Sequence, residues 1–191
     1  MELENKTTEE IFEIINTHMT RALMFHSEMV NYFEFLGLKG FRKLHEYQYF
    51  DESIGRMNFE SNYISMFNKL IKKEEIENIN IIPKELYNYS KLEVTKSAIS
   101  KYVKHAWNEY IKWEKETKEL YKNACILLYN RDKICECSLV FDYLKDVQNE
   151  LIEVYKIQET LNSSDYDNIY ILEIQDDLFK MYEKKMKTLK A

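Results

Sequence analysis

The chain has 191 residues and a formal net charge of −6, and only three glycines and one proline interrupt it. β-Sandwiches and α/β folds need turn residues every few positions, so this scarcity favours long helices. The acidic balance argues against non-specific nucleic-acid binding, which depends on a basic surface. Hydrophobic residues make up 45% of the chain and aromatic residues 14%, which argues against disorder.

The sequence also indicates a compartment. Its N-terminus is acidic and lacks the basic and apolar regions of a signal peptide, and no stretch approaches the roughly 18 apolar residues of a membrane span. The three cysteines, Cys125, Cys135 and Cys137, form neither a disulfide framework nor a Cys-x-x-Cys motif. We therefore expect a cytoplasmic protein with reduced thiols and no membrane contact. The bias toward Lys, Asn, Ile and Tyr is typical of an AT-rich bacterial or phage genome.

Residues 6–73 are predicted to form a helical hairpin. Thr7 and Glu10 form a capping-box pattern at its start, and apolar residues then recur at steps of three and four along one stripe. Gly37 is expected to end the first helix in the left-handed conformation. The connection after it is short, so the second helix should run antiparallel to the first. The inward face of that second helix is apolar at both ends and polar in the middle.

A break at residues 74–90 follows, because Pro83 cannot lie inside a helix and the asparagines around it favour turns. A short helical turn is expected directly after this proline. Three further helices are predicted at residues 91–129, 132–161 and 165–189. The sequence thus predicts a single all-α domain over the whole chain, an antiparallel bundle of four main long helices plus a C-terminal helix.

Polar residues on the inward faces are the candidates for function, since burying a polar group without a partner costs about 1–3 kcal/mol. If the first hairpin turns near residue 38, a residue of the first helix lies level with the residue of the second helix for which the two residue numbers add up to about 77. His26 then lies level with Asp51 and beside Glu52, with Gln48 one turn away. His45 is expected at a different level, nearer the turn.

The third helix offers His105 and Glu109, whose spacing of four lets both side chains reach one ion. Imidazole and carboxylate ligands suit iron, manganese or zinc. One alternative is therefore a metal site of His26, Glu52, His105 and Glu109, supported by a hydrogen bond from Gln48. The other alternative is structural, with a core hydrogen bond between His26 and Glu52 and a solvated pair on the third helix.

The stretch from Gly37 to Glu46 contains a Gly, then a Phe and then the pair His45-Glu46. This order and spacing resemble the link into the second helix of the starvation-type mini-ferritins. These belong to the ferritin-like superfamily, and the resemblance implies an antiparallel bundle with a site between helices. The di-iron branch carries a Glu-x-x-His motif on two helices, which this sequence lacks. Phe33 and Tyr49 stand where the mini-ferritin pattern implies a His and a carboxylate. The resemblance therefore implies the bundle rather than iron oxidation, and carries over no catalytic residue.

Two hypotheses for function follow. No phosphate loop, nucleophile elbow or His-Glu-x-x-His motif is present, which favours a protein without enzymatic activity. The hypothesis that the sequence favours is a helical-bundle protein that binds another protein or itself through its many Tyr and Phe side chains, such as a phage or prophage accessory factor. The alternative is a ferritin-like metal-binding protein with a His and carboxylate site between helices.

Overall fold

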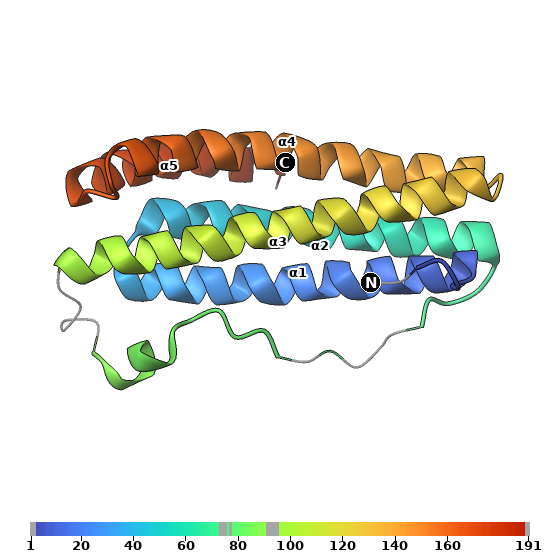
Figure 1. Ribbon diagram of the computed structural model, residues 1–191, viewed down its shortest axis with the longest axis horizontal. Coiled ribbons are helices and arrows are strands. Elements are labelled where there is room, and N and C mark those ends of the chain that lie inside the picture. Colours follow the sequence, from blue (N-terminus) through green and yellow to red (C-terminus); the bar gives the residue numbers. More distant parts are fainter. Residues whose placement is uncertain (1–2, 73–75, 77, 91–95, 190–191) are drawn as a thin grey trace.

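The computed structural model describes residues 3–72, 76, 78–90 and 96–189, and no β-strand occurs among them. In chain order the elements are α1 (Thr8–Leu36), α2 (Lys39–Phe67), the 3-10 helix η1 (Lys84–Asn88), α3 (Lys96–Asn130), α4 (Ile134–Ser163) and α5 (Asn168–Leu189). The predicted all-α bundle of four long helices and a C-terminal helix is thereby confirmed (Figure 1). None of the described helices combines the length and apolar character that crossing a bilayer requires.

The ends of α1 follow local sequence signals. The backbone amide of Thr7 donates to the Glu10 carboxylate at 2.7 Å, and the Glu10 amide donates to the Thr7 hydroxyl at 3.2 Å. This reciprocal pair satisfies two amides that helix geometry leaves without partners. At the other end Gly37 has a φ of 74°, the left-handed conformation that favours glycine. The predicted capping box and C-terminal glycine are both confirmed.

A long crossover connects the two halves of the bundle. α2 ends at Phe67, several residues before the predicted end of the hairpin, with Asn68 in the left-handed conformation. The described residues between α2 and α3 lie along one side of the bundle, and α2 and α3 begin at the same end (Figure 1). The expected helical turn after Pro83 is η1. The predicted start of the third helix at residue 91 lies outside the described residues.

The helices pack in pairs, α1 with α2 and α3 with α4, and α5 packs along α2. The approach of α5 is close because Gly40 has no side chain: a Cβ there would overlap the backbone carbonyl of Gln175. Farther along, the rings of Tyr47 and Tyr182 lie 5.5 Å apart. From the first contact to the second, the residue number rises along both helices, so α5 runs parallel to α2.

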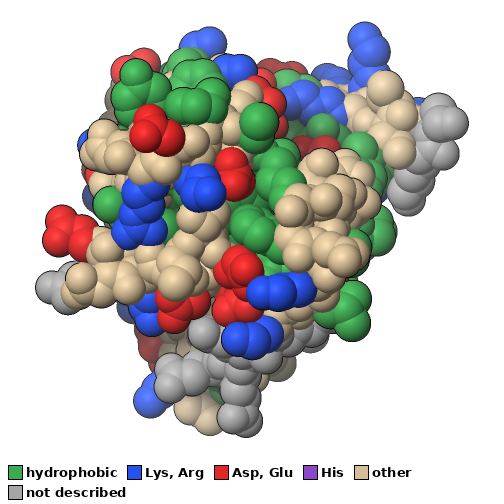
Figure 2. Space-filling view, turned by 90° about the vertical axis from the view of Figure 1, so that its right-hand side faces the viewer, with side chains coloured by type: hydrophobic (Ala, Val, Ile, Leu, Met, Phe, Trp, Pro, Cys, Tyr) green, Lys and Arg blue, Asp and Glu red, His purple; other side chains and the backbone are tan. Residues whose placement is uncertain are grey.

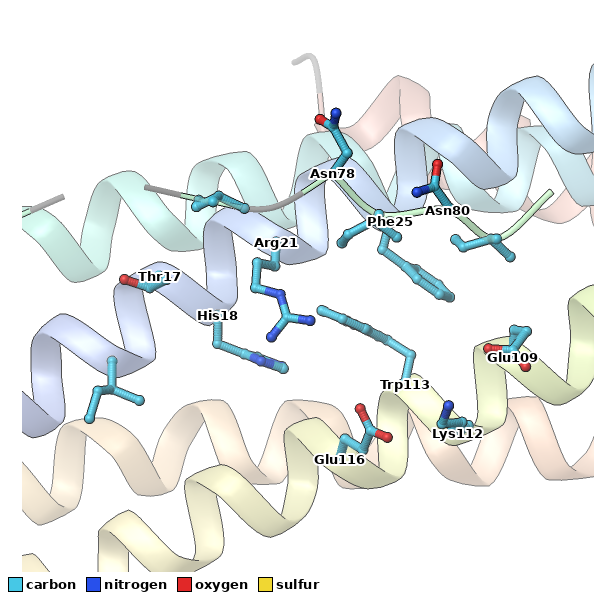
Figure 3. Close-up of a pocket in the computed structure, with 14 residues that line it drawn as sticks. Thr17, His18, Arg21, Phe25, Asn78, Asn80, Glu109, Lys112, Trp113 and Glu116 are labelled. Atoms are coloured by element: carbon cyan, nitrogen blue, oxygen red, sulfur yellow. The ribbon is translucent and has the colours of Figure 1, made fainter. Parts of the chain in front are cut away.

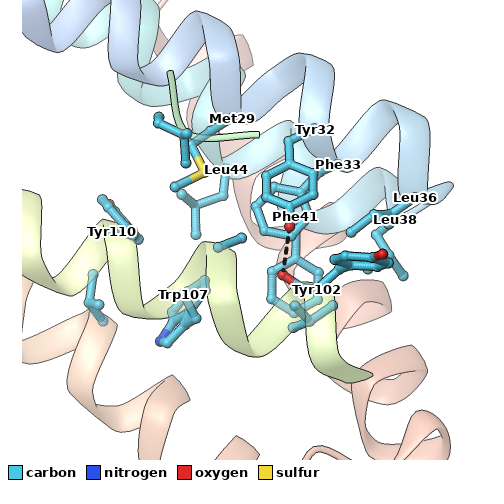
Figure 4. Close-up of a cluster of buried hydrophobic side chains, with 14 of the residues drawn as sticks. Met29, Tyr32, Phe33, Leu36, Leu38, Phe41, Leu44, Tyr102, Trp107 and Tyr110 are labelled. Carbon is cyan, nitrogen blue, oxygen red and sulfur yellow. Dashed lines mark hydrogen bonds between the residues drawn. The ribbon is translucent and has the colours of Figure 1, made fainter. Parts of the chain in front are cut away.

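Two apolar clusters fill the interior. One surrounds Trp107 at the end where α1 turns into α2, and the other surrounds Phe12 and Phe59 at the opposite end. Figure 4 shows the first cluster, in which the Tyr32 hydroxyl donates to the carbonyl of Tyr102 at 3.3 Å. The middle of the bundle, between the clusters, holds buried polar side chains.

Candidate functional site

Two of the four histidines form a buried pair between α1 and α2. The Nδ1 atoms of His26 and His45 lie 3.0 Å apart, and the two residues are only 1% and 0% exposed. Phe33 stacks on His45, and the edge of Tyr110 lies against the same imidazole. Burial lowers the pKa of His26 to about 3 and holds the pKa of His45 well below its usual value. Both imidazoles are therefore neutral at pH 7, and one Nδ1–H donates to the other Nδ1.

From the sequence, His45 is expected nearer the turn than His26, whereas in the structure the two imidazoles are in contact. The register between α1 and α2 explains the difference. Phe12 stacks on Phe59, and Phe33 stacks on Phe41. These partners lie three to six positions earlier in α2 than the assumed register implies. The shift moves the residue opposite His26 toward the turn and away from Glu52.

The structure does not bring the four predicted metal ligands together. His26 faces another histidine, and His105 donates from Nε2 to the carbonyl of Ile81 at 3.0 Å, which attaches the crossover to α3. Glu109 lines a cavity beside the crossover, whereas Glu52 lines a different cavity between α2 and α4. Within the described part of the chain, no three His, Cys, Asp or Glu side chains form a group that could hold a metal ion. The site built on these four residues stays a prediction without geometric support.

A layer of carboxylates occupies the middle of the bundle instead. Glu52 of α2, Glu114 of α3 and Glu150 of α4 repel one another there, and Glu114 is only 3% exposed. Burial, followed by the charges of Glu150 and Glu52, raises the pKa of Glu114 well above its ordinary value. Burial, followed by the charge of Glu52, raises the pKa of Glu150 to about 8. Burial, followed by Asp51 and Asp146, raises the pKa of Glu52 to about 7.

Further oxygen atoms surround this carboxylate layer. Gln48 is 4% exposed, and its Nε2 donates to the Tyr110 hydroxyl at 3.3 Å. Its Oε1 has no hydrogen-bond partner among the described residues. Tyr121 is also buried, and burial together with the charges of Glu52 and Glu114 raises its pKa. The polar layer thus offers carboxylate, amide and phenol oxygens, which are hard donor atoms.

An acidic cavity of about 320 Å³ joins this layer to the surface between α2 and α4. No lysine or arginine is among the described residues that line it. The Tyr143 hydroxyl donates to the carbonyl of Gly55 at 3.0 Å and so joins the two helices at its wall. Because all the charges on its walls are negative, the cavity attracts cations. Its acidic lining residues are Asp51, Glu52, Asp142, Asp146 and Glu150.

Sequence reasoning missed Glu114 and Glu150, although a signal for both was present. Glu114 follows Tyr110 by four residues and precedes Thr117 by three, and all three are buried on one face of α3. Glu150 follows the buried Val147 by three positions on α4. A carboxylate in step with buried neighbours on the same stripe marks an interior position.

No histidine accompanies the three glutamates of the layer in the Glu-x-x-His spacing of di-iron bundles. The residues three positions after them are Gly55, Thr117 and Glu153. The donor set is therefore made of oxygen alone, which suits Mg²⁺, Ca²⁺ or Mn²⁺ better than Zn²⁺.

Two antiparallel helix pairs joined by one long crossover, with carboxylates in the middle of the bundle, define a ferritin-like helical-bundle fold. No protein-family model matches the sequence, and no curated protein sequence is significantly similar to it. Two solved structures of a ferritin from the hyperthermophilic archaeon Archaeoglobus fulgidus are similar to the chain. They are a novel open-pore form and a form engineered to be closed, each with a TM-score of 0.71 and 17% identity. Each covers 92% of this chain, which in turn covers 97% of the open-pore form and 96% of the closed one.

Proposed function

We propose that this ferritin-like bundle binds a divalent cation in its interior through Glu52, Glu114 and Glu150. The observation that carries the proposal is a layer of acidic side chains from three helices, reached through a cavity whose described lining has no positive side chain. Buried like charges are destabilising unless they are protonated or matched by positive charge. A bound cation supplies that charge.

The side chains fit a hard cation in chemistry, and their carboxylates would have to change rotamer to surround one ion. The carboxylates are close enough to repel one another, yet they are not gathered around one point in the described structure. Glutamate has rotatable side-chain bonds, so rotamer changes would draw the three groups toward an ion. The free Oε1 of Gln48 is a further hard oxygen donor beside them. Of the three metals expected from the sequence, manganese suits this set best.

The similarity in fold to ferritins supports a metal-related role. At 17% identity the similarity concerns the fold, so the cation is argued from the residues of this chain. When bound, the cation would neutralise the carboxylates and join three helices. We do not propose iron oxidation, because the Glu-x-x-His histidines of di-iron bundles have no counterpart here.

Calorimetric titration with Mn²⁺, Ca²⁺ and Mg²⁺ at pH 7.5 tests this function. We expect the wild-type protein to bind at least one of these ions, and Glu114→Gln to weaken binding by a factor of about 10 or more. Glu119→Gln is the matched control, because Glu119 is an exposed carboxylate of the same helix and pairs with Lys122. No binding by the wild-type protein at millimolar ion, or equal binding by Glu114→Gln, would overturn the proposal.

A second candidate function is binding to another protein or to itself, which an exposed apolar surface favours. Around the turn between α3 and α4, Ile126, Tyr129 and Ile134 are 49%, 65% and 57% exposed. Figure 2 shows hydrophobic side chains on this end of the bundle. We propose that this end takes part in self-association. Light scattering coupled to gel filtration should show a larger species that Tyr129→Lys reduces, and a monomer at all concentrations would reject the role. The phage or prophage accessory role stays a prediction from composition.

A further inference from the structure

A second cavity, of about 580 Å³, lies between α1, α3 and the crossover. It shares no lining residue with the acidic cavity between α2 and α4. Its volume is within the range of small-molecule pockets, about 300–1,000 Å³. Figure 3 shows side chains from α1 and α3 facing one another across it, with the crossover along one side. The cavity is thus a candidate binding site separate from the carboxylate layer.

One wall of this cavity is aromatic. Trp113 of α3 stacks against His18 with ring centroids 4.7 Å apart, and against Phe25 at 4.8 Å. Figure 3 shows the indole between the two α1 rings. Trp113 is 7% exposed, so it is fixed in place by this packing. Both faces of the indole are covered by these two rings, so Trp113 lines the cavity with its edge, held rigidly in place.

His18 presents a fixed hydrogen-bond acceptor at this wall. Its Nε2 lies 2.7 Å from the Thr117 hydroxyl oxygen, which itself lies 3.0 Å from the carbonyl of Trp113. A carbonyl can only accept, so the hydroxyl donates to it and accepts from His18 Nε2–H, which assigns the tautomer. His18 Nδ1 then carries a lone pair, and it has no partner among the described residues. The residue is 6% exposed, and burial followed by the charge of Arg21 lowers its pKa to about 4, so this acceptor persists at neutral pH.

Charges of both signs surround the aromatic wall. Arg21 lies over the Trp113 ring, with its guanidinium carbon 5.7 Å from the centroid. Lys112, Glu109 and Glu116 complete the charged lining. None of these four side chains forms an ion pair with another residue that the structure describes. A cavity with unmatched positive and negative groups is complementary to a ligand that carries both charges.

We propose that this cavity binds a free α-amino acid whose aromatic side chain carries an N–H or O–H donor. The carboxylate would be held by the guanidinium of Arg21, and the ammonium group by the carboxylate of Glu116. The aromatic side chain would lie against the wall formed by Trp113, with its donor on His18 Nδ1.

Other ligand classes fit this lining less well. A phosphate-bearing ligand would bring two negative charges against Glu109 and Glu116. An uncharged aromatic molecule would cover charged side chains without matching them, which costs desolvation energy. A phenyl side chain would leave the acceptor of His18 covered and unpaired. The lining therefore selects for both the zwitterion and the side-chain donor.

Calorimetric titration of the full chain with L-tryptophan tests the proposal. A dissociation constant of about 1 mM or lower is expected for a ligand of this size. Tryptamine lacks the carboxylate, indole-3-propionate lacks the ammonium group and L-phenylalanine lacks the side-chain donor, so each should bind about 10-fold more weakly or worse. No binding of L-tryptophan at 10 mM, or a dissociation constant for any analogue equal to that of L-tryptophan, would overturn the proposed ligand class.

The variant Arg21→Gln locates the binding site. Arg21 is exposed, so the substitution should leave the fold intact while weakening binding of L-tryptophan about 10-fold. Arg42→Gln is the matched control, because Arg42 is a half-exposed arginine that pairs with Glu34 and does not line the cavity. Binding of L-tryptophan that Arg21→Gln leaves unchanged would place the ligand elsewhere and reject this site.

Discussion

Gln48 donates a hydrogen bond to the Tyr110 hydroxyl at 3.3 Å, and these two side chains lie between the imidazole of His45 and the carboxylate of Glu150, whose pKa values shift in opposite directions. The edge of Tyr110 lies against the imidazole of His45, whose pKa burial lowers. On the other side, Gln48 forms a hydrogen bond that favours the ionised form of Glu150, against the stronger effect of burial, which raises its pKa. The middle of the bundle should therefore lose stability at both alkaline and acidic pH.

The carboxylate layer predicts that the cation-free protein becomes less stable as pH rises. In the folded state the pKa values of Glu52 and Glu150 are about 7 and 8, above the ordinary value of 4.5. The folded protein thus binds more protons than the unfolded chain, and the stabilisation is lost as pH rises through 7 and 8. We expect the free energy of unfolding to fall by about 2–4 kcal/mol between pH 5.5 and 8.5, once water screening is allowed for.

Urea unfolding in the presence of a chelator measures this loss. Glu114→Gln removes one of the interacting charges and should flatten the dependence between pH 5.5 and 8.5. A wild-type stability that stays constant over this interval would mean that the carboxylates are solvated rather than buried together.

Added Mn²⁺ should counteract the alkaline loss. Protons and the cation compete for the same oxygens, so the rise in melting temperature should be larger at pH 8 than at pH 5.5. Calorimetric melting at both pH values, with equal Mn²⁺ concentrations, measures the difference. An equal rise at the two pH values would point to binding at surface carboxylates with ordinary pKa values.

The buried histidines predict the opposite effect in acid. The pKa values of His18 and His26 are about 4 and 3 in the folded protein, below the ordinary value of 6.5, so the unfolded chain binds more protons. Their stabilisation is complete above pH 6.5 and is lost as pH falls toward these folded-state values. The double variant His26→Gln, His45→Gln should be about 2–4 kcal/mol less stable than wild type at pH 7.5, because it loses a packed pair. This gap, measured by urea unfolding, should narrow as pH falls to 4, and a constant gap would show that the pair does not titrate on unfolding.

Local structure could be predicted from the sequence because its causes lie within a few residues. The bonds between Thr7 and Glu10, and the left-handed Gly37, depend on backbone groups of the same helix end. Along α1, helix periodicity likewise predicts the stripe that faces inward.

The candidate site depends on the register between helices, which local patterns do not determine. The register between α1 and α2 differs by three to six positions from the one assumed from the sequence. His26 therefore contacts His45 and not the predicted Glu52. The meeting of Glu114 with Glu150 depends on how α3 packs against α4, and so on side-chain volumes along both helices. The close approach of α5 to α2 requires that residue 40 has no Cβ.

The contact between α5 and α2 gives a final prediction from two helical glycines. At Gly40 an added Cβ would overlap the carbonyl of Gln175, whereas at Gly55 the nearest atoms would lie 3.7 and 3.9 Å away, in ordinary contact. Gly40→Ala should therefore destabilise the protein by about 2 kcal/mol or more and loosen α5. Gly55→Ala should be neutral or stabilising by up to about 1 kcal/mol, because alanine favours helix. Urea midpoints and the rate of tryptic cleavage at the α5 lysines measure both effects, and equal behaviour of the two variants would show that α5 does not pack against Gly40 in solution.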